Sequence, residues 1–243
     1  MQRPNSPPAI SFIVPAHNEE ALIGKTLAAI FATATRVIPY QFEVIVVDDF
    51  STDRTAAIAR EYGARVVSVA HRQIAATRNS GASAATGDIL VFVDADTVIR
   101  PPVLRAAIAA LRNGLVGGGC SIEIEGPLPI YGVIMQRLIS AFAPAIGLAG
   151  GCFFFCTRKA FDAAGGFDPR FFAAEEVALA RSLSRLGRFI VLRQTVLTSG
   201  RKLRAHSARD LLRLGVRIAR AGPAALHKRE GLEFWYGPRQ ASE

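Results

Sequence analysis

The chain contains 243 residues, 50% of them hydrophobic, and carries a formal net charge of +9 at pH 7. This length and composition suit one globular domain with a short appendage, and they exclude a largely disordered chain. The charge is uneven, because residues 201–243 hold ten Lys and Arg against four Asp and Glu, so we expect an anionic partner such as phosphate or acidic lipid there.

The first half of the chain alternates short apolar runs with helical patterns. We predict strands at Ile10–Val14, Phe42–Val47, Arg65–Val69 and Ile89–Val93, and helices at Ala21–Ala34, Ser51–Tyr62 and Ile74–Ala85. Ser51 or Thr52 is the expected cap of the second helix, and Gly63 is expected to end it. Unbroken apolar strands in this order indicate a parallel sheet covered by helices on both faces.

The second half is less regular. We predict helices at Pro101–Leu111, Glu175–Leu186 and Ser207–Ala221, and strands at Ser121–Glu125, Cys152–Thr157, Phe189–Leu192 and Thr195–Leu197. The apolar stretch Leu128–Cys156 is interrupted by Arg137 and Pro144. We therefore interpret it as a buried helix followed by a strand, because a membrane span needs about 20 nearly uninterrupted apolar residues.

Three cysteines, Cys120, Cys152 and Cys156, have no spacing typical of a disulfide framework or a zinc site. We interpret them as buried apolar side chains of a protein in a reducing compartment. The polar segment Met1–Pro8 lacks the apolar run of a secretory signal. We therefore expect a cytoplasmic protein, with peripheral contact at the inner face of the membrane as an open alternative.

Two carboxylates, Asp94 and Asp96, directly follow an apolar strand. They cannot both belong to the core, because a buried carboxylate needs a donor group or a metal. Mg²⁺ and Mn²⁺ prefer oxygen ligands, and Mg²⁺ commonly binds one or two protein carboxylates together with substrate phosphates. The alternative interpretation is an acidic turn at the end of the strand.

Asp48 and Asp49 end another strand on the same side of the predicted sheet, where open α/β sheets bind ligands. Asp49 is a candidate acceptor for a base N–H or a ribose hydroxyl, and the alternative is an acidic pair that favours the start of the next helix. His17 and Glu19 lie in the first strand–helix turn. Both are candidate ligand contacts. The alternative is that His17 is an ordinary loop histidine and that Glu19 is an acid in the first turn of a helix.

Arg78 lies on the third predicted helix, where its guanidinium can meet a phosphate or a base, or can remain a surface charge. Glu175 and Glu176 open a late helix. One of them can take a proton from an acceptor hydroxyl as a general base, while the alternative is a pair of ordinary acids in a first helical turn.

These motifs occur in one order along the chain: Pro15–Glu20, Val46–Asp53, Arg78–Asn79, Asp94–Asp96, Gly165–Asp168 and Glu175–Glu176. The series resembles glycosyltransferase family 2, the inverting enzymes of the GT-A fold, over about residues 9–200. The resemblance implies an α/β, Rossmann-like GT-A domain at residues 1–200, with a mixed, mainly parallel sheet flanked by helices. A basic helical tail at 201–243 would pack on or beside this domain.

By position, the resemblance implies that the nucleotide is held by the first turn, the paired aspartates and the third helix, at Pro15, His17, Glu19, Asp48, Asp49 and Arg78. It places Mn²⁺ or Mg²⁺ on Asp96, with Asp94 close to the ribose, the metal and its bound water. The family base falls on Glu176, which replaces the usual aspartate, so Glu175 remains an alternative.

The implied reaction is a metal-dependent, inverting transfer of one sugar from a UDP-, GDP- or dTDP-sugar to an acceptor hydroxyl. Two departures from the family pattern occur. Phe50 stands where the family usually has glycine, and no Gln-x-x-Arg-Trp motif follows Glu176, which argues against a processive polysaccharide synthase.

The basic tail begins with Arg201 and Lys202, which are candidate counter-charges for a diphosphate. Its predicted helix carries Arg209, Arg213, Arg217 and Arg220 on one face and Leu211, Leu214 and Ile218 on the other. This pattern is typical of a packed helix with a solvated face, and also of a helix on an anionic membrane, which would suit a lipid-linked acceptor. Nucleic acid is not expected, because no aromatic platform accompanies the charge.

Two other functions are considered: a sugar-phosphate nucleotidyltransferase and a non-catalytic protein that binds sugar nucleotides at a membrane. The first turn contains no glycine and two acids, Glu19 and Glu20, which would repel a nucleoside triphosphate. The presence of Asp94, Asp96 and Glu176 argues against a non-catalytic protein.

Overall fold

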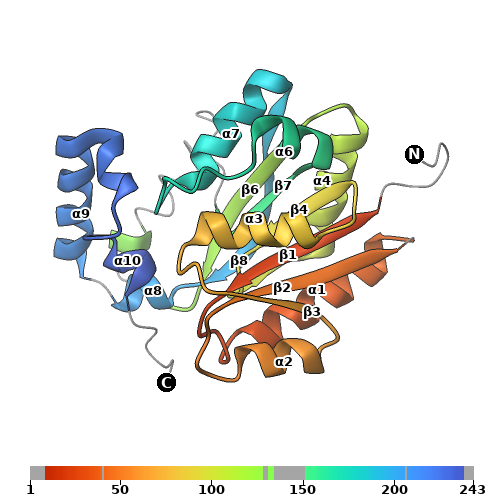
Figure 1. Cartoon of the computed structure of the whole chain (residues 1–243), viewed down its shortest axis with the longest axis horizontal. Helices are drawn as coiled ribbons and strands as arrows, with labels where there is room; N and C mark the ends of the chain where they lie inside the picture. Colours follow the sequence, from red (N-terminus) through yellow and green to blue (C-terminus); the bar gives the residue numbers. More distant parts are fainter. Residues whose placement is uncertain (1–8, 40, 128–130, 134–150, 206, 238–243) are drawn as a thin grey trace.

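The computed structural model describes residues 9–39, 41–127, 131–133, 151–205 and 207–237 of the chain. Its strands are β1 (Ile10–Ala16), β2 (Phe42–Asp49), β3 (Arg65–Val69), β4 (Ile89–Val93), β5 (Thr97–Val98), β6 (Gly117–Glu125), β7 (Phe153–Thr157) and β8 (Phe189–Ser199). They form one eight-stranded sheet in the order β3-β2-β1-β4-β7-β6-β8-β5 (Figure 1).

The strands of the first half are parallel. β1 pairs with β2 and with β4, and β2 pairs with β3, all in parallel register. The carboxyl ends of these strands therefore share one edge of the sheet. In the second half, β7 runs antiparallel between β4 and β6, β8 is parallel to β6, and β5 is antiparallel to β8. The expected mixed, mainly parallel sheet is confirmed.

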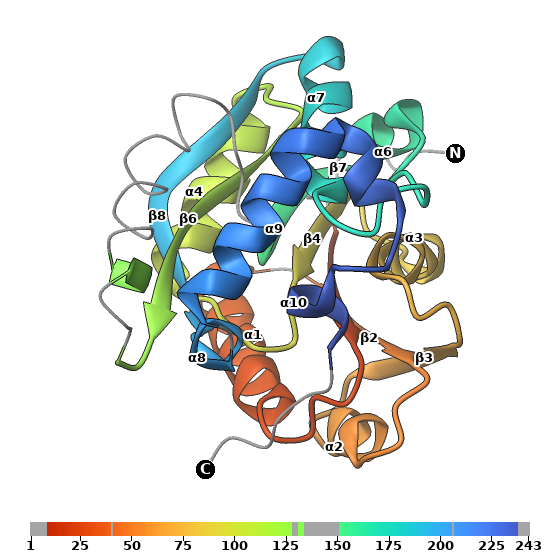
Figure 2. The same cartoon turned by 90° about the vertical axis from the view of Figure 1, so that its left-hand side faces the viewer.

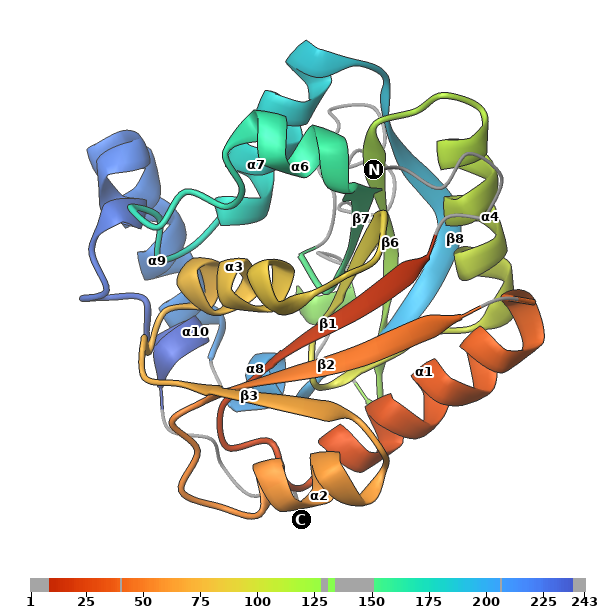
Figure 3. The same cartoon turned by 45° about the vertical axis from the view of Figure 1, so that its right-hand side comes forward.

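Helices cover both faces of the sheet. They are α1 (Ile23–Val37), α2 (Thr55–Glu61), α3 (Ile74–Ala84), α4 (Pro101–Arg112), α6 (Arg158–Ala164) and α7 (Glu175–Leu186). One core contains α1, α2 and α4 with alternate strand residues such as Phe12, and the other contains α3, α6 and α7 with residues such as Ile13. Neighbouring residues of a strand face opposite sides, so an all-apolar strand supplies both cores. Figure 3 shows the two layers on either side of the sheet.

The C-terminal part forms α8 (Arg201–Ala205), α9 (Ala208–Ala221), the 3₁₀ helix η1 (Gly222–His227) and α10 (Glu233–Tyr236). The predicted helix at Ser207–Ala221 is therefore present. Ser207 caps it and exchanges hydrogen bonds with Asp210 in a capping box. Figures 1 and 2 place α10 near the ends of β1 and β2, with α9 further out. No helix among the described residues is long and apolar enough to cross a membrane.

Some element boundaries differ from those predicted. The second helix begins at Thr55 instead of Ser51, because the Ser51 hydroxyl accepts from the Asn18 backbone N–H at 3.0 Å and Asp53 accepts from the Thr55 backbone N–H at 2.9 Å. The two short strands predicted after Leu186 are one strand, β8, with a register shift where Leu192 and Thr195 face consecutive residues of β6. Neither β5 nor α6 was predicted.

β6 is longer than predicted because it begins in a glycine run. A Cβ added to Gly118 would collide with the Ile190 carbonyl oxygen and with the Phe155 ring. Glycine therefore permits a close approach of three strands here. Of the helix and strand predicted in Leu128–Cys156, the strand is β7, while residues 128–130 and 134–150 lie outside the described part of the chain.

All three cysteines are buried and free, as predicted. Burial raises the pKa of the Cys120 thiol to about 12, and it raises the pKa values of Cys152 and Cys156 as well. These side chains therefore act as apolar core residues.

Candidate active site

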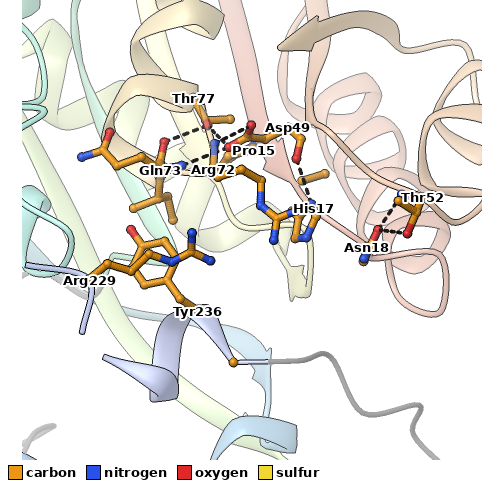
Figure 4. Close-up of a pocket in the computed structure, with 13 residues that line it drawn as sticks. Pro15, His17, Asn18, Asp49, Thr52, Arg72, Gln73, Thr77, Arg229 and Tyr236 are labelled. Carbon is orange, nitrogen blue, oxygen red and sulfur yellow. Dashed lines mark hydrogen bonds between the residues drawn. The ribbon is translucent and has the colours of Figure 1, made fainter. Parts of the chain in front are cut away.

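A cavity of about 340 Å³ lies at the edge where the parallel strands end (Figure 4). Its walls come from the ends of β1 and β2, from the start of α3 and from the C-terminal segment. The residues that line it are Pro15, Ala16, His17, Asn18, Asp49, Thr52, Arg72, Gln73, Ile74, Thr77, Arg229, Tyr236 and Gly237. Its volume is within the range of small-molecule sites, which begins at about 300 Å³.

Asp49 holds the start of α3 against the end of β2. Its carboxylate accepts hydrogen bonds from the Arg72 backbone N–H at 2.8 Å, the Gln73 backbone N–H at 3.2 Å and the Thr77 hydroxyl at 2.7 Å. Three donors fix the orientation of this carboxylate while it still lines the cavity. Asp49 therefore has the expected position, and it also has a structural task that the sequence did not indicate.

The turn after β1 forms a second wall. His17 Nδ1 lies 2.8 Å from the Asp49 carbonyl oxygen, which links the turns after β1 and β2. Asn18 has a left-handed φ of 52°, and its side-chain oxygen accepts from the Thr52 backbone N–H at 2.8 Å. Asparagine tolerates this backbone conformation better than most residues. Pro15 and His17 thus line the cavity, as the sequence suggested.

Asp48 does not line the cavity. Its side chain is buried within the sheet, and its Oδ1 has no hydrogen-bond partner among the described residues. β2 places the neighbouring residues 48 and 49 on opposite faces of the sheet, so only Asp49 faces the cavity.

Arg78 lies beside the cavity at the centre of an ionic cluster. It is 1% exposed, and its guanidinium donates to Glu175 at 2.6 Å, to Asp94 at 2.8 Å and to the Gly151 carbonyl at 2.8 Å. It also lies over the Phe167 ring, 5.2 Å from the centroid. Burial would lower the pKa of Arg78, but the carboxylates of Asp94 and Glu175 outweigh it and raise this pKa. Arg78 therefore meets protein carboxylates instead of opening toward a nucleotide.

Glu175 and Glu176 open α7, as predicted, directly after Ala174, whose φ of 61° is unusual for a residue with a side chain. The Glu175 side chain is 5% exposed and lies against Arg78, whereas Glu176 is half-buried. Burial and then the neighbouring Glu175 carboxylate raise the pKa of Glu176 to about 8, although Arg78 lowers it. Gly151 leaves room for Glu176, because an added Cβ would lie 3.1 Å from the Glu176 carboxyl carbon.

Asp96 and Glu19 form a second ionic group with the first residue of α8. The guanidinium of Arg201 pairs closely with the buried Glu19 carboxylate and lies 3.4 Å from the Asp96 carboxylate. Burial would lower the pKa of Arg201, but Glu19 and Asp96 raise it. Glu19, which was expected to contact the nucleotide, thus also holds the start of the C-terminal part of the chain. Asp96 faces the positively charged side chain of Arg201.

No group of three or more His, Cys, Asp or Glu side chains is arranged to hold a metal ion within the described ranges. The acidic residues expected to bind metal, Asp94 and Asp96, are present at the end of β4 and are each paired with an arginine.

Sequence reasoning missed several residues that line the cavity. Arg72 and Gln73 directly precede the third predicted helix and Thr77 lies in its first turns, so their place at a helix start that follows a strand could have indicated them. Gln73 caps this helix and also donates to the carbonyls of Pro169 at 2.8 Å and Phe171 at 2.7 Å. Arg229 and Tyr236 had no local signal, because only tertiary packing brings them to the cavity.

The model of Glycosyl transferase family 2 matches residues 11–162 of the chain. This range contains the cavity walls formed by β1, β2 and α3, together with Arg78, Asp94 and Asp96. Glu175, Glu176 and the C-terminal helices lie beyond it.

Two curated relatives resemble part of the chain. Validoxylamine A glucosyltransferase of Streptomyces hygroscopicus subsp. limoneus is 33% identical over 110 residues, which cover 42% of this chain and 24% of the relative. A 4,4'-diaponeurosporenoate glycosyltransferase of Staphylococcus haemolyticus is 43% identical over 123 residues, which cover 47% of this chain and 32% of the relative. The chain thus spans about a quarter to a third of the length of these relatives.

Solved structures share the fold. A mannosyltransferase from Pyrobaculum calidifontis in complex with GDP-Man and Mn²⁺ aligns with a TM-score of 0.63 at 23% identity, covering 92% of this chain and 64% of its own. Glucosyl-3-phosphoglycerate synthase from Mycobacterium tuberculosis, in complex with Mn²⁺, UDP and glucosyl-3-phosphoglycerate, aligns with a TM-score of 0.59 at 24% identity, covering 96% of this chain and 81% of its own.

Proposed function

The chain belongs to glycosyltransferase family 2, and from this membership we propose that it transfers one sugar from a nucleoside-diphosphate sugar to an acceptor hydroxyl, with inversion and with a divalent metal. The solved structures named above bind GDP-Man or UDP together with Mn²⁺, which supports a nucleotide-sugar donor. One observation carries the proposal: Arg78 joins Asp94 to Glu175, with Glu176 beside it, next to the cavity at the strand ends.

The cavity is the proposed site of the donor nucleoside. Its volume of about 340 Å³ is sufficient for a base and ribose, and it is lined by Asp49, His17 and Pro15. The Asp49 carboxylate is already held by three donors, so it presents its remaining lone pairs in a fixed direction. A fixed acceptor suits a base N–H or a ribose hydroxyl, because little orientational freedom is lost on binding.

The diphosphate of the donor would extend from the cavity toward the end of β4. Asp96 is the proposed ligand of Mn²⁺ or Mg²⁺, with Asp94 as its neighbour. The donor set fits, because such ions need only one or two protein carboxylates when phosphates complete the coordination, and the Asp96 contact with Arg201 is long at 3.4 Å. When bound, the cation would neutralise the charge on the departing diphosphate.

Arg201 would supply a second positive charge at the same place. It pairs with Glu19 and lies near Asp96, and its planar guanidinium can bind two diphosphate oxygens at once. Arg78 has a different proposed role. Its two terminal nitrogens donate to Asp94, Glu175 and the Gly151 carbonyl, so it positions the carboxylates instead of contacting the donor.

Glu176 is the proposed general base, because Glu175 is buried against Arg78 while Glu176 remains partly exposed. Its carboxylate would take the proton of the acceptor hydroxyl. The oxygen would attack the anomeric carbon from the face opposite the diphosphate, and the bond between this carbon and the diphosphate would break with its electron pair leaving on the diphosphate.

The acceptor and its location belong to the same proposal. The arginines of α9 at positions 209, 213, 217 and 220 support a peripheral contact with anionic lipid, which would suit a lipid-linked acceptor.

Glu176→Gln tests the base. We expect the release of nucleoside diphosphate from UDP-glucose, GDP-mannose or dTDP-glucose with Mn²⁺ to fall by about 10²- to 10⁴-fold, since the amide cannot accept the proton. The affinity for UDP or GDP, measured by calorimetry, should change less than about threefold, because Glu176 does not line the cavity. Glu61→Gln, an exposed change on α2, is the matched control.

Equal release rates for Glu176→Gln and Glu61→Gln would exclude Glu176 as the base. In the same series, Asp96→Asn should weaken UDP or GDP binding with Mn²⁺ present and leave it unchanged with a chelator. A wild-type protein that binds none of these nucleotides would overturn the proposed function as a whole.

A further inference from the structure

The C-terminal segment supplies one wall of the cavity. Arg229, Tyr236 and Gly237 line it together with Asp49 and Gln73, although they lie far beyond the part of the chain that matches the family model. In Figure 4, the Arg229 and Tyr236 side chains lie on one side of the cavity, away from Asn18 and Thr52. The cavity is thus enclosed by strand ends on one side and, on another, by a segment that the sequence motifs do not cover.

Specific contacts hold this segment in place. The Phe172 backbone N–H donates to the Leu226 carbonyl at 2.8 Å, and the Phe171 and His227 rings meet edge to face at 4.4 Å. Leu232 is 1% exposed, so an apolar anchor is buried between Arg229 and Tyr236 in the sequence. The wall is therefore docked on the loop before α7 by backbone, ring and apolar contacts.

The two side chains that face the cavity form a stacked pair. The Arg229 guanidinium lies over the Tyr236 ring, 5.0 Å from the centroid, and the Tyr236 and Phe172 rings meet in a T-shaped contact with 5.9 Å between their centroids. Arg229 is exposed and makes no ion pair with an acidic side chain in the described part of the chain. A guanidinium supported by an aromatic ring offers a flat surface and hydrogen-bond donors to a base.

The Tyr236 hydroxyl has an environment of its own. It is buried, beside the Ile74 backbone amide, and makes no hydrogen bond of normal geometry among the described residues. Its ring, rather than its hydroxyl, is therefore the group available to a ligand.

We propose that Arg229 and Tyr236 bind the nucleoside of the donor, as the wall of the site opposite the turns after β1 and β2. This proposal rests on the proposed function and assigns to the C-terminal segment a direct part in donor recognition. The ligand class is a nucleoside 5′-phosphate, whose base packs against the stacked pair while Asp49 accepts from its polar edge.

The position of the wall also connects the donor site to Glu176, the proposed general base. Gln73 donates to the carbonyls of Pro169 and Phe171, in the same loop on which the segment docks. This loop continues through Ala174 into Glu175 and Glu176. A bound nucleoside would therefore contact both groups that hold the loop before α7, which are Gln73 and the C-terminal wall.

The test uses the full chain and calorimetric titration with UDP and GDP, each with Mn²⁺, and with UMP and GMP. Tyr236→Ala should lower the affinity for the nucleotide that the wild type binds best by about tenfold, the usual effect of losing an aromatic stacking partner. Arg229→Met should weaken it severalfold. Because Arg229 is exposed, this change removes the guanidinium without opening the core.

Two variants serve as controls. Tyr236→Phe keeps the ring and should bind within about twofold of the wild type. Arg60→Met removes an exposed arginine from α2, away from the residues that line the cavity, and should bind normally. Thermal melting of each variant establishes that it is folded.

The losses should be equal for the monophosphate and the diphosphate, because the pair contacts the nucleoside. Wild-type affinity in both Arg229→Met and Tyr236→Ala would overturn the inference and leave the proposed function intact. A loss confined to UDP and GDP, absent with UMP and GMP, would also overturn it. Failure of the wild type to bind any of these nucleotides would instead be a failure of the proposed function.

Discussion

Arg78 is 1% exposed and faces the carboxylates of Asp94 and Glu175. Removing one member of a buried ion pair commonly costs about 3–5 kcal/mol, because the remaining charge is left without compensation. The sequence indicated Arg78, Asp94 and Glu175 separately, as surface or ligand-binding groups. Their contact with one another could not be predicted, because it depends on how α7 packs beside α3.

The pH dependence of the transfer reaction follows from the base. Burial and the Glu175 carboxylate raise the pKa of Glu176 to about 8, while Arg78 opposes them and Asp94 adds a smaller rise. Below this pKa the carboxyl group is protonated and cannot take the proton of the acceptor hydroxyl. The rate should therefore increase as the pH rises through the pKa of Glu176. Glu175→Gln removes the adjacent negative charge and should shift this rising limb toward lower pH.

The measurement is kcat/KM against pH for the wild type, Glu175→Gln and the control Glu61→Gln. An unchanged limb in Glu175→Gln, or a shift toward higher pH, would contradict an electrostatic effect of Glu175 on the base. Glu61→Gln should keep the wild-type profile, because Glu61 is an exposed residue of α2.

Phe50 occupies a strained position at the turn after β2. Its φ is 60°, and its side chain is 60% exposed, so it has an unfavourable backbone conformation with little burial to offset it. The left-handed conformation costs a residue with a side chain roughly 1–2 kcal/mol. Glycine removes this strain, but its greater conformational entropy in the unfolded chain offsets part of the gain in stability. Phe50→Gly should therefore stabilise the protein by about 0.5–1 kcal/mol in urea unfolding.

Tyr62 provides the matched aromatic control. It has an ordinary φ of −80° and packs against Gly24, so Tyr62→Gly should destabilise the protein in the same measurement. Destabilisation by Phe50→Gly would show that the Phe50 side chain makes stabilising contacts that outweigh the backbone strain.

At the level of elements, hydrophobic periodicity predicted most of the strands and helices, including the helix that carries Glu175 and Glu176. It failed where polar side chains bind backbone groups of another turn. α2 begins at Thr55 because Ser51 accepts from the Asn18 backbone, a contact between residues 33 positions apart. It also failed at β6, where glycines are required by neighbouring strands rather than by a turn.

α8 is a short element whose first residue links the tail to the end of β4. Arg201→Met removes the cation shared by Glu19 and Asp96 and leaves two carboxylates close to the proposed diphosphate position. We expect the Kd for UDP or GDP to rise by about tenfold or more, since charge-assisted contacts are worth about 1.5–3 kcal/mol. Calorimetric titration measures this directly.

Arg204→Met is the control on the same helix, because Arg204 is exposed and donates to the Glu125 carbonyl instead of to an acid. It should leave the nucleotide affinity within about twofold of the wild type. A similar loss in both variants would indicate that the helix as a whole, and not the Arg201 guanidinium, is required.

On the scale of the whole molecule, the strand order brings the residues after β1, β2 and β4 to one edge, and this much followed from the βα alternation of the sequence. His17, Asp49 and Asp94 could therefore be assigned to one region before any coordinates. The C-terminal wall could not be assigned, because the contacts of Tyr236 with Phe172 and Arg229 arise only when the tail folds back on the domain.

The cluster around Arg78 has a consequence for how this sequence can vary. The three residues lie after β4, on α3 and on α7, and the one guanidinium is shared by both carboxylates. Exchange of the guanidinium for an apolar group would leave the buried Glu175 and the partly exposed Asp94 without their cation, so we expect it to be tolerated only if the acids change as well. We therefore expect substitutions at these three positions to occur together in related sequences.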